Sequence, residues 1–229
     1  MARYAIYYMP HEQSALSRFG CSVLGYDAVS GTDVPYPDDP VFLDPAALGW
    51  TAAPRRYGFH ATLKPPFKLA AGRSVEDLMA HLAIFSADQR AFSVDLKLAD
   101  LEHFLALVPV EVPPALRRLA DVCVREFDGY RAPLSPADRE RRHPDRLSPS
   151  ELENLDRWGY PHVFDDFRFH MTLTGPLEAD DRVRLEPVLR DMFESVPQTA
   201  PIDAIALLRQ GDDEQDRFIV QARFPFTSP

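Results

Sequence analysis

The sequence predicts an α+β protein with an internal duplication: two lobes, each an antiparallel sheet backed by helices. Three observations support this prediction. The stretch Arg56–Lys64 has a near copy at Asp166–Thr174, the order strand, helix and hairpin is expected after each copy, and the spacing between the copies is constant. We therefore expect one bilobal domain over residues 1–229, with a groove on a pseudo-two-fold axis between the lobes.

Both copies alternate apolar and polar residues, which is typical of a half-buried strand. The apolar sets are Tyr57, Phe59, Ala61 and Leu63 in the first copy, and Phe167, Phe169, Met171 and Leu173 in the second. A strand sends successive side chains to opposite faces. Each copy should bury its apolar set and present His and Thr together on the other face, as His60 with Thr62 and His170 with Thr172.

The N-terminal part is expected to form a strand, a short helix and a long loop. Arg3–Met9 is apolar and ends at Pro10, and Ser14–Leu24 has helical spacing of apolar residues. Residues 31–54 are rich in Pro, Asp and Gly and predict a loop across the surface. The strand Arg56–Lys64 should follow and end at Pro65 and Pro66.

Similar elements are expected after each copy. Ser74 should cap a helix to about Ala87, followed by strands Phe92–Ala99 and Phe104–Val110, and a helix should run from Pro113 to about Phe127. After the second copy we expect a helix over 180–196 and strands Ile202–Leu208 and Arg217–Phe224. The offset is constant because His170 minus His60 is 110, and Phe92 plus 110 is Ile202. The repeats are thus about 55–111 and 165–225.

The segment of about residues 130–162 is a polar insertion without a counterpart in the other repeat. It contains the charge run Arg139–Arg146 and should be helical in pieces. A charge run is usually a solvated face. The alternative is that this run forms a lid that meets a second phosphate of a ligand.

Composition limits the choice of partners. The chain has 229 residues, ordinary globular composition and a net charge of −10. Proteins that grip long nucleic acid normally carry a basic face, so long nucleic acid is disfavoured, although an RNA end could enter a locally basic groove. A small phosphorylated substrate is compatible with this charge. No apolar signal core or membrane segment is present, so we expect a cytoplasmic protein with no membrane partner. The oligomeric state is open.

The two cysteines, Cys21 and Cys123, lie in apolar, helix-like settings and predict buried thiols. The spacing of the histidines forms no local metal-ligand motif, and there is no Cys-His cluster. We therefore expect neither a metal nor another cofactor.

The paired motifs predict acid–base chemistry by two imidazoles and two hydroxyls. Imidazole titrates near neutral pH, so one ring can be neutral while the other is protonated. His60 and His170 are the candidate acid and base. Thr62 and Thr172, on the same strand face, could donate hydrogen bonds to an anionic group.

Three cations near the histidines are candidate substrate-binding residues. Arg56, Lys64 and Arg168 lie at i−4, i+4 and i−2 from their histidine and could attract phosphate at the rim of the groove. The alternative is that they are strand-end charges in water. Tyr57, on the opposite face, is expected in the core.

The motifs Phe59-His-Ala-Thr-Leu63 and Phe169-His-Met-Thr-Leu173 resemble the twin motifs of the 2H phosphoesterases. The longer stretch Arg56–Phe67 resembles a bacterial subgroup of that superfamily associated with phosphonate-utilisation operons. The resemblance implies that His60, Thr62, His170 and Thr172 perform the chemistry. It also makes a phosphorylated ribose cyclic phosphate a candidate substrate.

The predicted function is a metal-independent phosphodiesterase acting on a small cyclic or 2′-linked phosphodiester. One alternative is processing of RNA ends with a 2′,3′-cyclic phosphate, or 2′,5′ RNA ligation. An alternative of another class is a binding protein that holds a phosphorylated metabolite without turnover.

Overall fold

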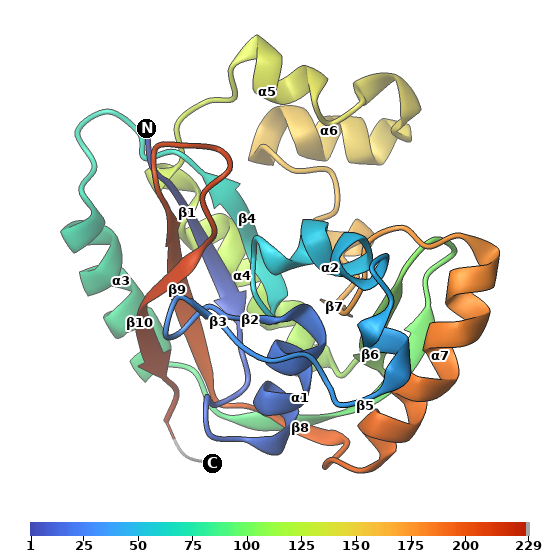
Figure 1. Ribbon diagram of the computed structural model, residues 1–229. Helices are drawn as coiled ribbons and strands as arrows, with labels where there is room; N and C mark the ends of the chain where they lie inside the picture. Colours follow the sequence, from blue (N-terminus) through green and yellow to red (C-terminus); the bar gives the residue numbers. More distant parts are fainter. Residues whose placement is uncertain (228–229) are drawn as a thin grey trace.

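The structure is a computed structural model that describes residues 1–227 (Figure 1). The strands are β1 (Arg3–Tyr8), β2 (Tyr26–Asp27), β3 (Thr32–Asp33), β4 (Ala61–Phe67), β5 (Phe92–Asp100), β6 (Leu105–Pro109), β7 (Met171–Thr172), β8 (Thr199–Ile202), β9 (Ala204–Gln210) and β10 (Ile219–Pro225). The α-helices are α1 (Ala15–Leu24), α2 (Ala47–Arg55), α3 (Val75–Ala87), α4 (Pro114–Glu126), α5 (Pro136–Glu140), α6 (Pro149–Trp158) and α7 (Ala179–Glu194). The predicted α+β class is confirmed.

Eight strands form one antiparallel sheet in the order β10-β9-β1-β4-β7-β6-β5-β8. The two strands that carry the His-x-Thr motifs, β4 and β7, are neighbours at its centre. They are joined by one residue pair, Ala61 with Met171. The sheet therefore consists of two four-stranded halves, and the pseudo-two-fold axis passes between β4 and β7.

The hairpins do not occupy equivalent places in the two halves. Counted outward from the β4–β7 pair, β5 and β9 are each the third strand of their half. The partner of β5 in its hairpin, β6, lies on the side nearer the centre, whereas the partner of β9, β10, lies at the edge of the sheet. The inner place of the first half is occupied by β1, which pairs with both β4 and β9. The hairpin that follows one motif in sequence thus pairs in the half that contains the other motif.

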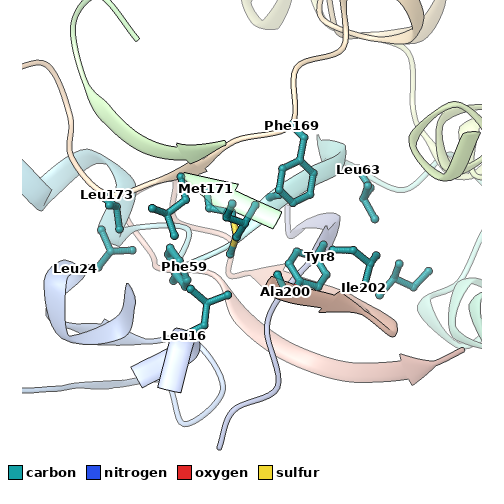
Figure 2. Close-up of a cluster of buried hydrophobic side chains, with 14 of the residues drawn as sticks. Tyr8, Leu16, Leu24, Phe59, Leu63, Phe169, Met171, Leu173, Ala200 and Ile202 are labelled. Atoms are coloured by element: carbon teal, nitrogen blue, oxygen red, sulfur yellow. The ribbon is translucent and has the colours of Figure 1, made fainter. Parts of the chain in front are cut away.

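Helices pack against both halves of the sheet. α3 contacts β9 and β10, α4 contacts β4, and α7 contacts β5 (Figure 1). The apolar residues of both motif copies meet in one core, where Phe59 and Leu63 lie among Phe169, Met171 and Leu173 (Figure 2). Burial of these residues leaves the histidines and threonines on the opposite face of the sheet.

The predicted strand Arg56–Lys64 is wrong at both ends. Arg56 caps α2, and Gly58 has a φ of +74°, so the chain turns before β4 begins at Ala61. β4 then continues through Pro65 and Pro66 to Phe67. The pairing with β1 shifts between Ile6–Lys64 and Tyr4–Phe67, so a bulge accommodates the two prolines, which have no N–H to donate.

The second predicted strand, Asp166–Thr174, is also wrong in extent, because only Met171–Thr172 pair as a strand. Before it, the Asp166 carboxylate accepts hydrogen bonds from Ser150 and Asn154 and so ties the chain to the insertion. After it, the buried Thr174 hydroxyl accepts a hydrogen bond from the Leu105 N–H. Side-chain contacts thus hold the chain before β7, whereas after it the N–H groups of Leu173 and Thr174 still donate to the Leu105 carbonyl of β6.

The predicted loop over 31–54 contains β3, a 3₁₀ helix at Pro40–Leu43 and α2. Trp50 is buried and its indole N–H donates to Asp181 of α7 at 3.0 Å, so a tertiary contact holds α2 in place. Local composition does not reveal that contact.

Several other predictions are confirmed. Ser74 caps α3 by accepting a hydrogen bond from the Asp77 N–H, and the insertion is helical in pieces, as α5, α6 and a 3₁₀ turn at Pro144–Arg146. Cys21 and Cys123 are buried free thiols. Among residues 1–227, the helices are all too short or too polar to cross a lipid bilayer.

Candidate active site

The two motifs face each other across the β4–β7 pair. Because Ala61 pairs with Met171 in antiparallel register, His60 lies opposite Thr172 and Thr62 lies opposite His170. All four side chains are half-buried. Directly opposed residues of antiparallel strands have Cβ atoms about 4.5–5.5 Å apart. The sheet therefore places two imidazoles and two hydroxyls in one cluster.

Both imidazoles are held by the same local hydrogen bond. The Nδ1 of His60 lies 2.9 Å from the carbonyl oxygen of Gly58, and the Nδ1 of His170 lies 2.8 Å from that of Arg168. A carbonyl can only accept, so Nδ1 carries the proton and donates in both residues. In the neutral rings Nε2 is then free to accept a proton.

Thr62 shares its hydroxyl with His60. The Thr62 Oγ1 lies 3.2 Å from the Nε2 of His60, which accepts this hydrogen bond when it is neutral. A phosphoryl oxygen placed beside Thr62 would compete for the same proton. The reactive nitrogen and a hydroxyl donor therefore lie within hydrogen-bonding distance of each other.

Aromatic rings flank each histidine. The ring of Tyr7 on β1 stacks on that of His60 with centroids 3.8 Å apart, and the ring of Tyr57 lies 6.1 Å from it. Phe104 lies 5.9 Å from His170. Each histidine therefore has an aromatic neighbour on the active-site face.

The environment favours neutral imidazoles. Burial lowers the pKa of His60 to about 4; the hydrogen bond to the Gly58 carbonyl opposes this, and the nearby His170 lowers the pKa further. Burial also lowers the pKa of His170, against the effect of the Arg168 carbonyl.

The face around His60 is a pocket of about 430 Å³. The lining includes His60, Thr62 and Thr172. The fourth motif residue, His170, is next to them but is not part of the lining. The lining also contains two carboxylates, Asp138 and Glu214, and seven cationic residues: Arg3, Arg56, Lys64, Lys68, Arg131, Arg141 and Arg142. A protein of net charge −10 thus concentrates positive charge at this pocket.

The three cations predicted to bind substrate have different surroundings. Arg56 lines the pocket, and its Nη2 donates to the Glu214 carbonyl. Lys64 borders the pocket, but its buried ammonium is 3.3 Å from Asp128 and donates to the Val124 carbonyl at 3.1 Å. Burial lowers the pKa of Lys64 to about 8, while Asp128 raises it.

Arg168 is exposed, is not among the residues that line the pocket, and meets His170 through its backbone carbonyl. The structure therefore brings Arg56 to the histidines as a pocket cation and gives Lys64 an ion-paired position in the core. It leaves the guanidinium of Arg168 outside the pocket.

The insertion forms a wall of the pocket. Arg141, Arg142, Trp158 and Tyr160 belong to the lining, and the helices α5 and α6 lie above the end of β4 that carries Phe67 (Figure 1). Arg139, from the same charge run, pairs with Asp156 on the exposed side. The run Arg139–Arg146 is therefore divided: part of it is a solvated face, and part of it faces the pocket.

Sequence reasoning missed several residues of the pocket. Tyr7 and Arg3 lie on β1, far from both motifs in sequence, and Tyr57 lines the pocket although its alternation predicted the core. The turn at Gly58 reorients Tyr57. Gly58 has a positive φ, a conformation that favours glycine. The glycine within Tyr57-Gly-Phe59 was therefore a signal in the sequence that the chain could turn at this point.

Among residues 1–227, the structure contains no cluster of three or more His, Cys, Asp or Glu side chains that could hold a metal ion.

Residues 62–219 match the model of a family described as "Protein of unknown function (DUF1045)". The chain is 34% identical over 233 residues to a ribose 1,5-bisphosphate phosphokinase PhnN of Janthinobacterium sp. (strain Marseille), covering 99% of this chain and 51% of that protein. It is 35% identical over 186 residues to a protein of the same name from Laribacter hongkongensis (strain HLHK9), covering 78% and 41%. The chain spans about half the length of these curated relatives or less.

Solved structures with a similar chain path include E. coli LigT complexed with 3′-AMP, with a TM-score of 0.44 and 15% identity over 99% of this chain and 98% of that one. A structure described as a phosphoesterase has a TM-score of 0.42 and 14% identity over 98% of both chains. Because the family model covers more than half of the sequence, the chain belongs to the DUF1045 family.

Proposed function

We propose that this protein is a 2H-type phosphodiesterase that hydrolyses a small cyclic phosphodiester without a metal ion. The observation that supports the proposal most strongly is the register of β4 and β7, which places His60 opposite Thr172 and Thr62 opposite His170. Two imidazoles and two hydroxyls on one face are the groups that such a reaction requires. The surrounding positive charge suits an anionic substrate.

In the proposed reaction, one imidazole removes a proton from water, whose oxygen attacks phosphorus. The bond from phosphorus to the ring oxygen breaks as the other imidazole gives that oxygen a proton. The product is a phosphomonoester with a free hydroxyl group. The threonine hydroxyls donate to the non-bridging oxygens, where negative charge accumulates.

We assign the base to His60 and the acid to His170. A pKa of about 4 leaves His60 almost entirely unprotonated at pH 7, so its Nε2 can accept a proton but has none to give. The hydrogen bond from Nδ1 to the Gly58 carbonyl stabilises the charge that His60 gains on protonation. A bound anion would raise the pKa of both imidazoles, and because the pKa of His60 is lowered more strongly, His170 is the ring that takes up the proton first.

A phosphorylated ribose cyclic phosphate is our candidate substrate. The relatives' name refers to a phosphorylated ribose, and the operon association of the resembling subgroup points to the same sugar. The kinase activity in that name belongs to proteins of which this chain spans about half or less. Gly20 and Gly25 have the spacing of a phosphate-binding loop, but they lie in and at the end of α1, and Tyr26 and Asp27 follow them instead of Lys and Ser or Thr.

A phosphorus-NMR screen tests the proposal. Wild type and the variants His60→Ala and His170→Ala are incubated with cyclic mononucleotides and ribose cyclic phosphates, with and without EDTA. We expect a phosphomonoester from at least one substrate with wild type, little from either variant, and no effect of EDTA. Complete loss of activity in EDTA would contradict the metal-free mechanism. Binding without turnover would favour a protein that only holds the metabolite.

A further inference from the structure

The pocket holds more unpaired positive charge than one phosphodiester can neutralise. Lys64, Lys68, Arg131 and Arg141 each form an ion pair with Asp128, Asp138 or Glu214. Arg3, Arg56 and Arg142 form no salt bridge with any described residue, although all three line the pocket and are half-buried. A phosphodiester carries a single negative charge, so these three guanidinium groups suit a further anion.

Neutral groups hold two of these guanidinium groups and leave hydrogen-bond donors free. Arg3 donates from Nε to the Gln210 side chain at 2.6 Å. Its two terminal nitrogens donate no hydrogen bond to another described residue. Arg56 donates from Nη2 to the Glu214 carbonyl, but its buried Nε has no hydrogen-bond partner among residues 1–227. A buried donor without an acceptor is unfavourable, so an acceptor from a ligand would stabilise this arrangement.

Three tyrosines of the lining also offer free donors. The phenols of Tyr7, Tyr57 and Tyr160 make no hydrogen bond to another described residue. Outside the pocket, by contrast, the phenols of Tyr8, Tyr26 and Tyr130 donate to the carbonyls of Pro201, Phe218 and Asp77. Each of the three lining tyrosines therefore keeps a hydroxyl to which a ligand could bond.

These groups converge on one region of the pocket. Arg142 lies over the ring of Tyr160, with its Cζ 5.1 Å from the ring centroid. Arg3 and Arg56 are joined through the β9–β10 turn, because Arg3 donates to the Gln210 side chain, whose Nε2 donates to the same Glu214 carbonyl that accepts from Arg56. On β1, Arg3 precedes Tyr7 by four residues on the same strand face, which corresponds to about 13 Å along the strand.

The pocket therefore has two ends. Tyr7 stacks on His60, so it lies where the phosphodiester reacts, and Arg3 lies further along the same strand. We propose that Arg3, Arg56 and Arg142, with Tyr57 and Tyr160, form a second anion subsite that binds a terminal phosphomonoester of the substrate. This inference rests on the proposed function, because it assumes that the reacting phosphodiester lies against His60 and His170.

A phosphomonoester suits the subsite better than a second diester does. Its charge is close to −2 at pH 7, and its three terminal oxygens can accept several hydrogen bonds. Guanidinium groups bind such oxygens with two parallel hydrogen bonds. Three arginines without carboxylate partners and two phenols therefore match the charge and the number of acceptors.

Matched substrate pairs test the subsite. Adenosine 2′,3′-cyclic phosphate is compared with its 5′-phosphorylated form, and ribose 1,2-cyclic phosphate with its 5-phosphate. Each pair shares the same diester and differs only in the terminal phosphate. We expect wild type to prefer the phosphorylated member of a pair that it hydrolyses by about tenfold or more in kcat/KM.

The variants Arg142→Gln and Tyr160→Phe should reduce this preference, by about tenfold for the arginine and several-fold for the phenol. Arg146→Gln is the matched control, because Arg146 belongs to the same charge run but is exposed and lies outside the lining. Its ratio should equal that of wild type. Circular dichroism melting curves establish that each variant is folded.

Two outcomes would overturn the subsite: no preference of wild type within any pair that it hydrolyses, or an equal loss for both members of a pair in Arg142→Gln. The latter would mean that Arg142 serves the diester itself. If no pair reacts, calorimetry with ribose 5-phosphate and with ribose decides. If ribose 5-phosphate binds, ribose does not, and Arg142→Gln weakens the binding, the subsite is supported and the phosphodiesterase proposal is rejected. Equal affinity for ribose 5-phosphate and ribose would reject the subsite.

Discussion

The carbonyl groups of Gly58 and Arg168 determine what the two histidines can do. Each accepts a hydrogen bond from the Nδ1 of the histidine two residues later, so both rings keep the same tautomer and direct Nε2 away from the backbone. At Arg168 the backbone is the functional group, because the side chain is exposed outside the pocket. A residue can therefore belong to the site without its side chain.

Replacing either histidine by alanine should lower kcat/KM by about 10²–10⁴-fold. A substrate with a nitrophenolate leaving group distinguishes the roles, since this group departs without a proton. We expect the loss in His170→Ala to shrink on that substrate and the loss in His60→Ala to persist. The rate of nitrophenol release measures both losses. If the loss shrinks in His60→Ala and persists in His170→Ala, the assignment of acid and base is reversed.

Burial of His60 should also make stability depend on pH. Its pKa of about 4 in the folded chain lies below the value of about 6.5 in an unfolded chain. As pH falls from 6.5 toward 4, the unfolded state binds a proton that the folded state does not, so the folded state loses stability. Between pH 7.5 and 5, wild type should lose about 2 kcal/mol more than His60→Gln.

Urea unfolding at the two pH values measures this difference. His103→Gln, at an exposed position, is the matched control and should follow wild type. Parallel loss of stability in wild type and His60→Gln would show that burial does not lower the pKa of His60.

At the scale of elements, the turn between α2 and β4 fixes the first motif. Gly58 has a φ of +74°, and a Cβ there would lie 2.6 Å from the Cβ of Ala28. Gly72 has a similar φ of +76°, but a Cβ there would meet no atom within 4 Å. The two glycines therefore separate the cost of backbone conformation from the cost of a steric clash.

Gly72→Ala should destabilise the protein by about 1–2 kcal/mol, which is the cost of the left-handed conformation. Gly58→Ala should cost more and should also lower activity, because the carbonyl that holds His60 would move. Thermal unfolding and kcat/KM of both variants check this prediction. Equal destabilisation with unchanged activity in Gly58→Ala would show that the turn does not position His60.

At the scale of the whole molecule, an acidic exterior surrounds a basic pocket. The net charge is −10, while the lining has seven cationic residues and two carboxylates. Such a distribution repels a long polyanion but admits a small one. Charge therefore selects ligands by size before any contact with the histidines forms.

The KM for a small cyclic phosphodiester should rise several-fold between 50 and 500 mM NaCl, because salt screens the attraction. An RNA of about twenty nucleotides should not compete with that substrate at micromolar concentration, whereas inorganic phosphate should compete at millimolar concentration. Steady-state kinetics at both salt concentrations measure these effects. Strong competition by the RNA would favour the alternative function at RNA ends.

Much of the fold follows from local patterns. Helix α3 begins after Ser74 because the hydroxyl accepts from the Asp77 N–H, and Phe59 and Phe169 are buried as the alternation predicts. The limits of the motif strands do not follow from such patterns. The strand β4 crosses two prolines through a bulge against β1, and β7 pairs with β4 through the single residue pair of Met171 and Ala61. Those partners are distant in sequence.

The sequence by itself determined the two His-x-Thr motifs and the burial of the apolar residues around them, because a strand's alternation depends only on neighbouring residues. These buried residues are Phe59, Ala61, Leu63, Phe169, Met171 and Leu173. Tertiary structure alone decided that Arg3 and Tyr7 of β1, Tyr160 of the insertion and Glu214 of the β9–β10 turn meet at one pocket. It also placed the Lys64 ammonium beside Asp128. The reason is physical: which strand pairs with which, and which charge finds a partner, depend on long-range contacts that form only when the whole chain folds.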